Sequence, residues 1–244
     1  MENNEHSIVH HLLSEKRRIG RISQIRELIF GAQDGLLTSI IIVSTVAGAF
    51  ADNHVVLITG VAQGLAGAIS MGTGAFLASE AEHQVRHAEL VKERAANRHS
   101  PEEEKEEMLL LFEHEGVPKH NATAIVENLM TSEKAFFNTM VQKEFGIDPA
   151  PSTTPLADSF VVGISYLITS FIPLVPYFFL PVKHALFYSL SLTIFTLFGL
   201  GMLKAKFANL HYIKSGLQIL VIGALSGLGG YLLGTALPRL LGIK

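Results

Sequence analysis

Long runs of apolar residues recur along the chain, separated by short polar links and by one long charged stretch. A helix needs about 20 apolar residues to cross the hydrocarbon core of a bilayer. Five runs are long enough, at residues 28–50, 55–78, 157–180, 184–203 and 213–237. The pattern therefore predicts an all-α membrane protein with five transmembrane helices.

The stretch between the second and third runs is charged, and its spacing is helical. Residues 80–97 carry charges without a helix breaker, so they are expected to extend the second transmembrane helix. Ser100 and Pro101, followed by three acids, predict a helix start and a helix over 103–115. A further helix is expected over 122–145. The predicted stops are Gly116, Pro118, Gly146 and Pro149.

These patterns divide the chain into four segments. A polar, basic N-terminal segment covers 1–26, the first two spans cover 27–79, an acidic helical insert covers 80–155, and three further spans cover 156–244. The insert is expected to be a helical hairpin standing on the extended second helix. Its predicted apolar contacts join Leu109, Leu110, Leu111 and Phe112 to Ile125, Leu129, Phe136, Phe137 and Met140.

Charge is distributed unevenly, and this predicts the orientation. Lys and Arg are enriched in the cytoplasmic flanks of membrane spans. Five cations precede the first span: Lys16, Arg17, Arg18, Arg21 and Arg26. We therefore expect the N-terminus and the insert in the cytoplasm and the C-terminus on the opposite side. The chain has no cysteine, which excludes disulfides, thiolate metal sites and cysteine nucleophiles.

Asp34 is a carboxylate inside the first apolar run. The uninterrupted run after it, 36–50, is too short to cross a bilayer alone, so Asp34 is expected within the membrane. A charge there costs about 3 kcal/mol on insertion scales, and such residues usually line ion pathways or proton relays. The alternative is structural, a helix cap or a buried hydrogen-bond partner, because Asp-Gly is also turn chemistry.

Three further polar or soft residues lie near Asp34 in the predicted antiparallel pair of spans. Met71 is expected at the same depth, and a carboxylate with a thioether suits a borderline cation such as Fe²⁺ better than Mg²⁺ or Ca²⁺. Methionine is also a common gap-filler, so Met71 alone decides nothing. Glu27 is expected at the cytoplasmic mouth, either functional or merely interfacial. Gln63 is expected to face the bundle.

Acidic residues of the insert recur three or four positions apart, which brings side chains together on one helix face. Like charges so placed repel each other unless a cation lies between them. The alternative is a solvated acidic face, and His83 and His87 are equally compatible with ordinary surface histidines. The candidate metal ligands are Glu93, Glu104, Glu107, Met140 and Glu144, with weaker signals at Glu89, Glu103, His83 and His87.

Glycine and proline spacing adds two expectations about packing. Glycines three or four apart in the second and fifth runs let helix backbones approach closely, either within the chain or at an oligomer seam. Pro173 and Pro176 should kink the third span, and neighbouring helices must then satisfy the freed carbonyls.

Two motifs and the insert together resemble one known family. Residues 34–38, Asp-Gly-Leu-Leu-Thr, and 67–72, Gly-Ala-Ile-Ser-Met-Gly, followed by an acidic helical insert and three spans, resemble the vacuolar iron transporter family. That family includes yeast-type Ca²⁺-sensitive cross-complementers and nodulin-like members. The resemblance covers nearly the whole chain from Arg26 onward.

The resemblance implies a homodimeric antiporter that exports Fe²⁺, and often Mn²⁺, from the cytosol in exchange for protons. It places the path between the first and second spans of both subunits, with Asp34 and Met71 as transport residues, Glu27 and Gln63 along the path, and the insert acids collecting metal. No permanent cofactor is implied, and Co²⁺ and Zn²⁺ are further candidate ions. The host membrane would be the plasma membrane in a prokaryote or the vacuolar membrane in a eukaryote.

Three positions depart from the best-known plant pattern: Gln63 and Ala96 stand where glutamates are expected, and Val141 stands where a second methionine is expected. The Gln63 departure weakens the case for proton coupling through that side chain, and the other two reduce the ligands of the insert. A membrane-anchored metal sensor or a structural dimer is the alternative function. Enzyme motifs are absent from the spans, and nothing indicates a nucleic-acid partner.

Overall fold

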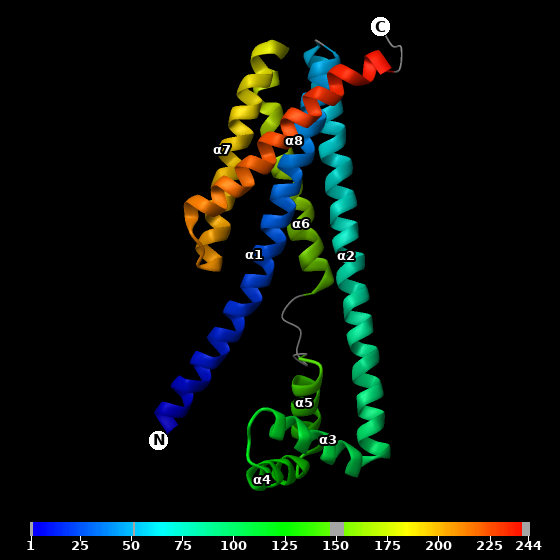
Figure 1. Cartoon of the computed structure of the whole chain (residues 1–244), viewed down its shortest axis with the longest axis vertical. Helices are drawn as coiled ribbons and strands as arrows, with labels where there is room; N and C mark the ends of the chain where they lie inside the picture. Colours follow the sequence, from blue (N-terminus) through cyan, green and yellow to red (C-terminus); the bar gives the residue numbers. More distant parts are fainter. Residues whose placement is uncertain (1, 51, 147–153, 241–244) are drawn as a thin grey trace. The chain divides into compact units, whose positions relative to one another are not determined.

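The computed structural model describes residues 2–50, 52–146 and 154–240, and the side chains of 2–23, 96 and 237–239 lie outside that description. Every regular element in those residues is helical (Figure 1). The elements are α1 Glu2–Ala49, α2 Asn53–His99, α3 Pro101–His114, α4 Lys119–Met130, α5 Glu133–Glu144, α6 Pro155–Ser170, the 3₁₀ helix η1 Ile172–Phe178, α7 Val182–Ala208 and α8 Tyr212–Leu240.

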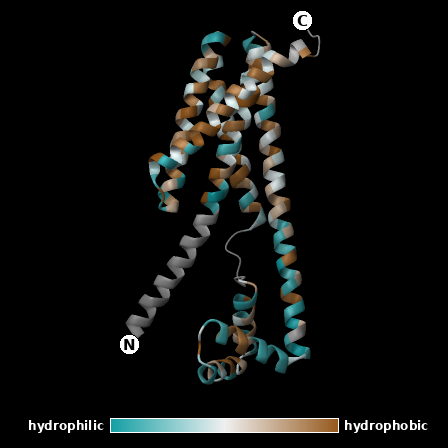
Figure 2. Ribbon diagram, viewed as in Figure 1, coloured by the Kyte–Doolittle hydropathy of each residue, from teal (hydrophilic) through white to brown (hydrophobic). Residues whose placement is uncertain are grey.

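Five stretches of these helices are long and apolar enough to cross a bilayer, which confirms the five predicted spans. They are Gln24–Ala49, Pro155–Phe178, Val182–Ala208, Tyr212–Ala236 and a part of Asn53–His99. The last of these helices has 47 residues, more than twice the length that a span needs. Its first half is apolar and its second half is largely hydrophilic (Figure 2).

The chain divides into two compact units. The membrane unit is Met1–Leu77 with Thr153–Lys244, and the insert unit is Ala78–Ser152. The boundary falls within α2, where the apolar sequence gives way to the charges that begin at Glu80.

α1 is the central helix of the membrane unit. It packs against α6, α7, α8 and η1. Leu36, Ile40 and Val43 are fully buried, and their spacing of four and three residues places them along one side of the helix. Leu36 packs with Leu197 of α7 and Ile219 of α8, whereas Val43 belongs to a cluster formed with α2, η1 and α7.

The third span is broken at its prolines, as the sequence predicts. α6 ends at Ser170, and the 3₁₀ helix η1 then contains Pro173 and Pro176. Side chains from three other helices satisfy carbonyls in this region. Ser39 of α1 donates to the Ser170 carbonyl at 2.6 Å and Ser189 of α7 donates to the Pro173 carbonyl at 2.6 Å. Asn53 of α2 donates to the carbonyls of Tyr177 and Leu180 at 2.9 and 2.6 Å.

The glycine rows of α2 and α8 pack within the chain. A Cβ at Gly64 would lie 2.7 Å from the Ser170 hydroxyl, and one at Gly60 would overlap Leu174. In α8, a Cβ at Gly230 would lie 2.6 Å from the Ile41 carbonyl of α1. The glycine spacing was compatible with close packing within the chain or at an oligomer seam. These contacts show that the glycines named here pack within the chain.

The insert unit contains one helix more than the sequence predicts. The expected helix 122–145 is two helices, α4 and α5, because Ser132 caps the second by accepting a hydrogen bond from the Ala135 amide. Serine is a favoured N-cap residue, and a new helix therefore begins after Ser132 instead of α4 continuing through it. Gly116 has a φ of +92° and follows α3, as predicted. The Pro149 stop lies outside the described residues.

Three details of the predicted insert are wrong. Ser100 occupies the cap position of α3, but its side chain makes no cap hydrogen bond. Leu110 and Ile125 were predicted to pack in the core but are 60% and 38% exposed. Residues near them on the same helices point into the core instead. The observed core consists of Met108, Phe112, Ala122, Val126, Phe136 and Met140, with Leu109, Leu111 and Leu129 packed against it.

Candidate functional site

Asp34 lies within the Gln24–Ala49 span of α1 and is half buried. α1 is continuous through Asp34 and Gly35, so Asp34 is not a helix cap. Among the described residues, no hydrogen bond or ion pair involves its carboxylate. A membrane carboxylate without such partners retains its full capacity to bind a cation or a proton.

Tyr166 is the polar residue that joins α1 and α2 beside Asp34. Its hydroxyl accepts a hydrogen bond of 2.6 Å from Gln63 Nε2, shares a second bond with Thr38, and lies within electrostatic range of Asp34. The tyrosine is 2% exposed. Sequence reasoning missed this residue, although a tyrosine inside an apolar span is a signal, because its buried hydroxyl requires a partner.

Gln63 faces the bundle, as expected from its polarity, and one end of its amide lacks a partner. Its Nε2 donates to Tyr166, while its Oε1 is buried without a hydrogen bond. A buried unsatisfied carbonyl oxygen costs about 1–3 kcal/mol, so its retention calls for an explanation. This oxygen can accept from a protonated group or contribute to a cation site.

Gly67 makes the close approach of Tyr166 possible. A Cβ at this position would lie 2.5 Å from the Tyr166 ring carbons Cε1 and Cζ, and still closer to the hydroxyl. Met71 lies one turn further along α2, on the same side as Gly60, Gly64 and Gly67, and is half buried. The described contacts join Asp34 to Gln63 through Tyr166, and they include none between Asp34 and Met71.

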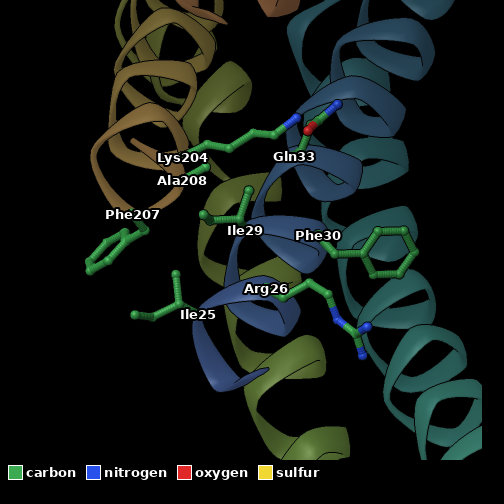
Figure 3. Close-up of a pocket in the computed structure, with 8 residues that line it drawn as sticks. All are labelled: Ile25, Arg26, Ile29, Phe30, Gln33, Lys204, Phe207 and Ala208. Carbon is green, nitrogen blue, oxygen red and sulfur yellow. The ribbon is translucent and has the colours of Figure 1, made fainter. Parts of the chain in front are cut away.

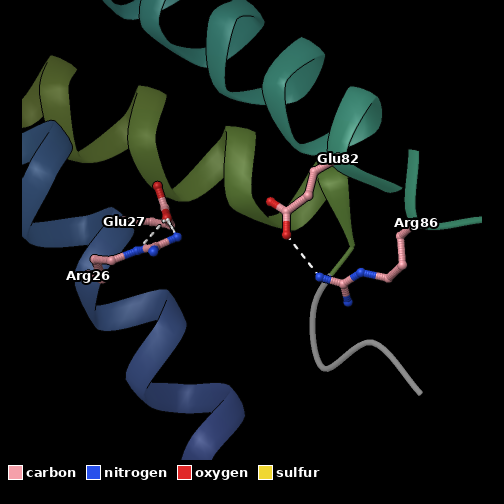
Figure 4. A network of polar contacts seen from close by, with 4 residues as sticks. All are labelled: Arg26, Glu27, Glu82 and Arg86. Carbon is pink, nitrogen blue, oxygen red and sulfur yellow. Dashed lines mark hydrogen bonds and ion pairs between the residues drawn. The ribbon is translucent and has the colours of Figure 1, made fainter. Parts of the chain in front are cut away.

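Glu27 is covered by its neighbour in the chain. Arg26 donates from Nη2 and Nε to Oε1 of Glu27 at 2.7 and 3.1 Å, and the Glu27 side chain is 17% exposed (Figure 4). The Arg26 side chain is 78% exposed, so the ion pair is weak and open to exchange. Figure 4 also draws a separate pair of the insert unit, Glu82 with Arg86 at 2.8 Å, which is an ordinary i,i+4 helix pair.

Four predicted metal residues gather in the insert unit. Glu93 of α2 and Glu104 of α3 are 8% and 6% exposed, and the carboxyl group of Glu93 lies close to those of Glu104 and Glu144. Glu107 is exposed but within electrostatic range of all three. Oε1 of Glu93 and Oε2 of Glu104 are buried without a hydrogen-bond partner.

Burial and mutual repulsion disturb the titration of this cluster. Burial, followed by the charges of Glu104 and Glu144, raises the pKa of Glu93 from 4.5 to about 8. Burial and nearby carboxylates also raise the pKa of Glu104 and of Glu144. Neighbouring carboxylates repel each other unless one of them is protonated or a cation lies between them. This repulsion is one reason why their pKa values are raised.

The remaining predicted insert residues are packed in the apolar core, paired with a cation or exposed, and among them Glu103 lies within electrostatic range of Glu104. Met140 is 1% exposed and packs in the apolar core of the insert. Glu89 pairs with Lys92 at 2.7 Å. Glu103, His83 and His87 are exposed, and the side chain of Ala96 lies outside the description. Within the described residues, no three His, Cys, Asp or Glu side chains stand in a ready-made metal-binding arrangement.

Comparison with known proteins adds the family. The model of the VIT family matches residues 25–235, which covers the insert and all but the outermost residue of the first and last spans. The chain belongs to the VIT family. The resemblance indicated by the two sequence motifs is thereby confirmed, and VIT membership together with five apolar helices makes this a multi-pass membrane protein.

Three plant relatives illustrate the similarity. The "Vacuolar iron transporter" of Centaurea cyanus is 33% identical over 210 residues, covering 85% of both chains. "Vacuolar iron transporter 1" of Eucalyptus grandis is 31% identical over 208 residues, covering 85% of this chain and 84% of the relative. The protein of the same name from Arabidopsis thaliana is 30% identical over 210 residues, covering 86% and 84%. These relatives are named as transporters, not as enzymes.

Proposed function

We propose that this chain is a secondary transporter that moves Fe²⁺ out of the cytosol in exchange for protons. The transport of iron is supported by the relatives, which are named vacuolar iron transporters and are similar to this chain over most of its length. The observation that carries the mechanism is Asp34, a carboxylate in a membrane span that accepts no hydrogen bond from the described residues. Mn²⁺ is a second proposed substrate.

Asp34 exchanges a metal ion for a proton in this mechanism. Bound Fe²⁺ neutralises a carboxylate that is otherwise costly in the membrane. After the metal leaves on the far side, the empty site returns with a proton on Asp34, so one group serves both ions alternately. Met71 supplies a soft sulfur ligand, and Gln63 and Tyr166 orient the polar side of the path beside Asp34.

The insert supplies metal to the membrane unit in this proposal. Fe²⁺ replaces the shared proton of the Glu93 cluster and occupies the oxygens of Glu93 and Glu104 that lack a partner. Glu144 and Glu107 complete the negative charge around it. Glu27 acts at the mouth of the path, where metal must displace Arg26 before it can bind.

A two-fold dimer completes the path, with α1 and α2 of each subunit at the seam and the insert on the cytoplasmic side. Two copies of Asp34 then face one ion and balance its double charge. α2 leaves large apolar residues exposed in a single chain, among them Ile58, Leu65 and Ile69, and these support contact with a partner on the side of α2 that faces away from Met71.

Metal flux into proteoliposomes that contain an internal pH dye tests the proposal. Asp34→Asn keeps the shape of the side chain but cannot change charge, so we expect it to abolish both Fe²⁺ flux and the coupled pH change. Asp52→Asn is the matched control, because Asp52 is an exposed aspartate at the start of α2 and its side-chain oxygen accepts from the His54 amide. This control is expected to transport normally.

Two results would contradict the mechanism. Wild-type flux from the Asp34→Asn protein would remove Asp34 from the path. Metal binding by the wild-type protein without any flux would favour the alternative of a membrane-anchored metal sensor.

A further inference from the structure

Four cations adjoin the acids of the Glu93 cluster in the sequence, yet none forms an ion pair with the cluster among the described residues. They are Lys92 and Arg94 around Glu93, Lys105 after Glu104 and Lys143 before Glu144. Three of them pair with acids outside the cluster: Lys92 with Glu89 at 2.7 Å, Lys105 with Glu127 at 3.5 Å and Lys143 with Glu115. The cluster therefore remains open to an added cation, although four cations lie next to it in the chain.

Two phenylalanine rings of the insert hold cations that flank the cluster. The guanidinium carbon of Arg94 lies 4.8 Å from the centroid of the Phe137 ring, and Nζ of Lys143 lies 4.2 Å from that of Phe112. A cation within about 6 Å of a ring centroid is attracted to the electron-rich face of the ring. Phe137 and Phe112 are 7% and 9% exposed, so packing holds both rings in place. No hydrogen bond or ion pair engages Arg94 among the described residues, which leaves the Phe137 ring as its partner.

The chain contains another adjacent Arg–Glu pair, and in that pair no ring intervenes. Arg26 and Glu27 follow each other in α1, and there the guanidinium donates to the carboxylate at 2.7 and 3.1 Å. Phe30 lies one turn further along α1 and lines a groove together with Arg26, but its ring does not lie over the guanidinium (Figure 3). Adjacent positions therefore allow an arginine to close over a glutamate, and a ring beneath the arginine is what distinguishes Glu93 and Arg94.

Glu93 offers Arg94 a favourable site that remains unused. The Oε1 atom of Glu93 is buried without a hydrogen-bond partner, and a guanidinium carries five donors in a geometry that fits a carboxylate. If Arg94 closed over this oxygen, a divalent cation would have to displace the guanidinium before binding. Metal affinity would then fall, because binding would require that ion pair to break.

We propose that Phe137 is a positioning residue of the insert, which holds Arg94 away from Glu93 and thereby keeps the Glu93 cluster available to a divalent cation. Phe112 has the same role toward Lys143. Neither ring touches the metal in this arrangement, and each acts through the cation that it holds. The inference rests on the proposed role of the cluster as a metal site.

Variants that lack the same ring but differ in the cation test this role. Mn²⁺ binding is measured by calorimetry on the full-length protein in detergent, at fixed pH and ionic strength, and every protein carries Asp34→Asn so that the membrane site does not contribute. The variants are Phe137→Leu, Arg94→Gln and the two changes together. Phe136→Leu is the matched control, because Phe136 is 3% exposed in the apolar core of the insert and no cation lies over its ring among the described residues.

We expect Phe137→Leu to weaken Mn²⁺ binding about fivefold, which corresponds to the release of one cation–π contact into competition with the metal. Adding Arg94→Gln to Phe137→Leu should restore the affinity to within about twofold, and Arg94→Gln alone should change it by less than about twofold. Both Phe137→Leu proteins lack the same ring, so damage to packing would affect them alike and cannot account for the rescue. Phe136→Leu should leave the affinity unchanged.

Unaltered affinity in the Phe137→Leu protein would overturn this inference, and so would a loss that Arg94→Gln does not restore. An equal loss in Phe136→Leu would also overturn it, since the effect would then be general damage to the core. In each of these cases the metal site itself would stand. Absence of Mn²⁺ binding from the protein with both rings intact would instead contradict the proposed metal role of the cluster, and this inference with it.

Discussion

Gly67 is a residue whose missing side chain positions a functional one. The Tyr166 hydroxyl occupies the space that a Cβ at position 67 would need, and from there it reaches Gln63, Thr38 and the neighbourhood of Asp34. Because the overlapping ring belongs to a buried tyrosine with 2% exposure, it has little room to move aside.

Gly67→Ala is therefore expected to destabilise the protein by about 1–3 kcal/mol, the usual cost of overpacking. The same change should weaken the Gln63–Tyr166 bond and reduce iron flux. Gly74→Ala on the same helix is the control, because nothing lies within 4 Å of a Cβ there. Thermal unfolding in detergent would measure the difference, and equal melting of the two variants would contradict the packing argument.

The raised pKa of Glu93 predicts that the stability of the insert depends on pH in an unusual way. Its pKa is about 8 in the folded chain against 4.5 ordinarily, so the folded state holds its proton more tightly than the unfolded state. The stability that this proton contributes is fully present below pH 4.5 and is lost as the pH rises toward 8. Without metal, the insert should be less stable at pH 8 than at pH 5.

Amide hydrogen exchange of α3 to α5 in the full-length protein, corrected for intrinsic exchange, measures this effect. Mn²⁺ should restore protection at pH 8 by taking the place of the proton. Glu93→Gln should remove both the pH dependence and the metal effect, whereas Glu106→Gln, at an exposed position, should retain both. Protection that rises with pH in the metal-free wild type would show that the sign is wrong.

At the scale of elements, the third span shows how polar side chains make a broken helix acceptable in a membrane. A carbonyl freed by proline has no water to bond with in lipid and must find a donor within the protein. Ser39, Ser189 and Asn53 supply these donors around η1, each from a different helix.

Ser189→Ala should consequently cost about 1–2 kcal/mol, since it leaves the Pro173 carbonyl buried without its donor. Ser191→Ala is a matched control two residues away, because the Ser191 hydroxyl is exposed and bonds only to the Phe187 carbonyl of its own helix. Denaturant unfolding should separate the two variants. Identical midpoints would mean that η1 does not depend on this bond.

The elements that were predictable from sequence are those fixed by local patterns. Apolar run length gave the five spans, and Pro173 with Pro176 gave the break in the third. The split between α4 and α5 was missed because the apolar spacing continues across Ser132, where one capping bond decides. Tyr166 was missed for a different reason, since its partners lie on two other helices and depend on how the spans pack.

At the scale of the whole molecule, α2 leaves a long apolar stripe uncovered. Ile58, Leu65 and Ile69 are 70%, 49% and 68% exposed, and their spacing of seven and four residues places them on one side of the helix. Gly60, Gly64 and Gly67 occupy the opposite side, against α6 and η1. Intramolecular packing therefore uses one side of α2 and leaves the other free for a partner.

Ile69→Cys is expected to form a disulfide across the two-fold axis of the proposed dimer in lipid, with no background because the chain has no cysteine. Phe195→Cys, at a position 75% exposed on α7, should remain unlinked at the same lipid-to-protein ratio. Non-reducing electrophoresis reports the result. Equal cross-linking at positions 69 and 195 would mean random collision. If neither Ile69→Cys nor Leu65→Cys forms a cross-link, this seam is excluded.

The side-chain hydrogen bonds around η1 also affect the order in which the spans can enter the membrane during synthesis. Ser39 and Asn53 precede the third span on the ribosome, but Ser189 is synthesised after it. Until α7 emerges, the Pro173 carbonyl lacks the Ser189 donor and the third span is less suited to release into lipid. We expect the translocon to retain it and to discharge the third and fourth spans together, as a hairpin closed at Pro181.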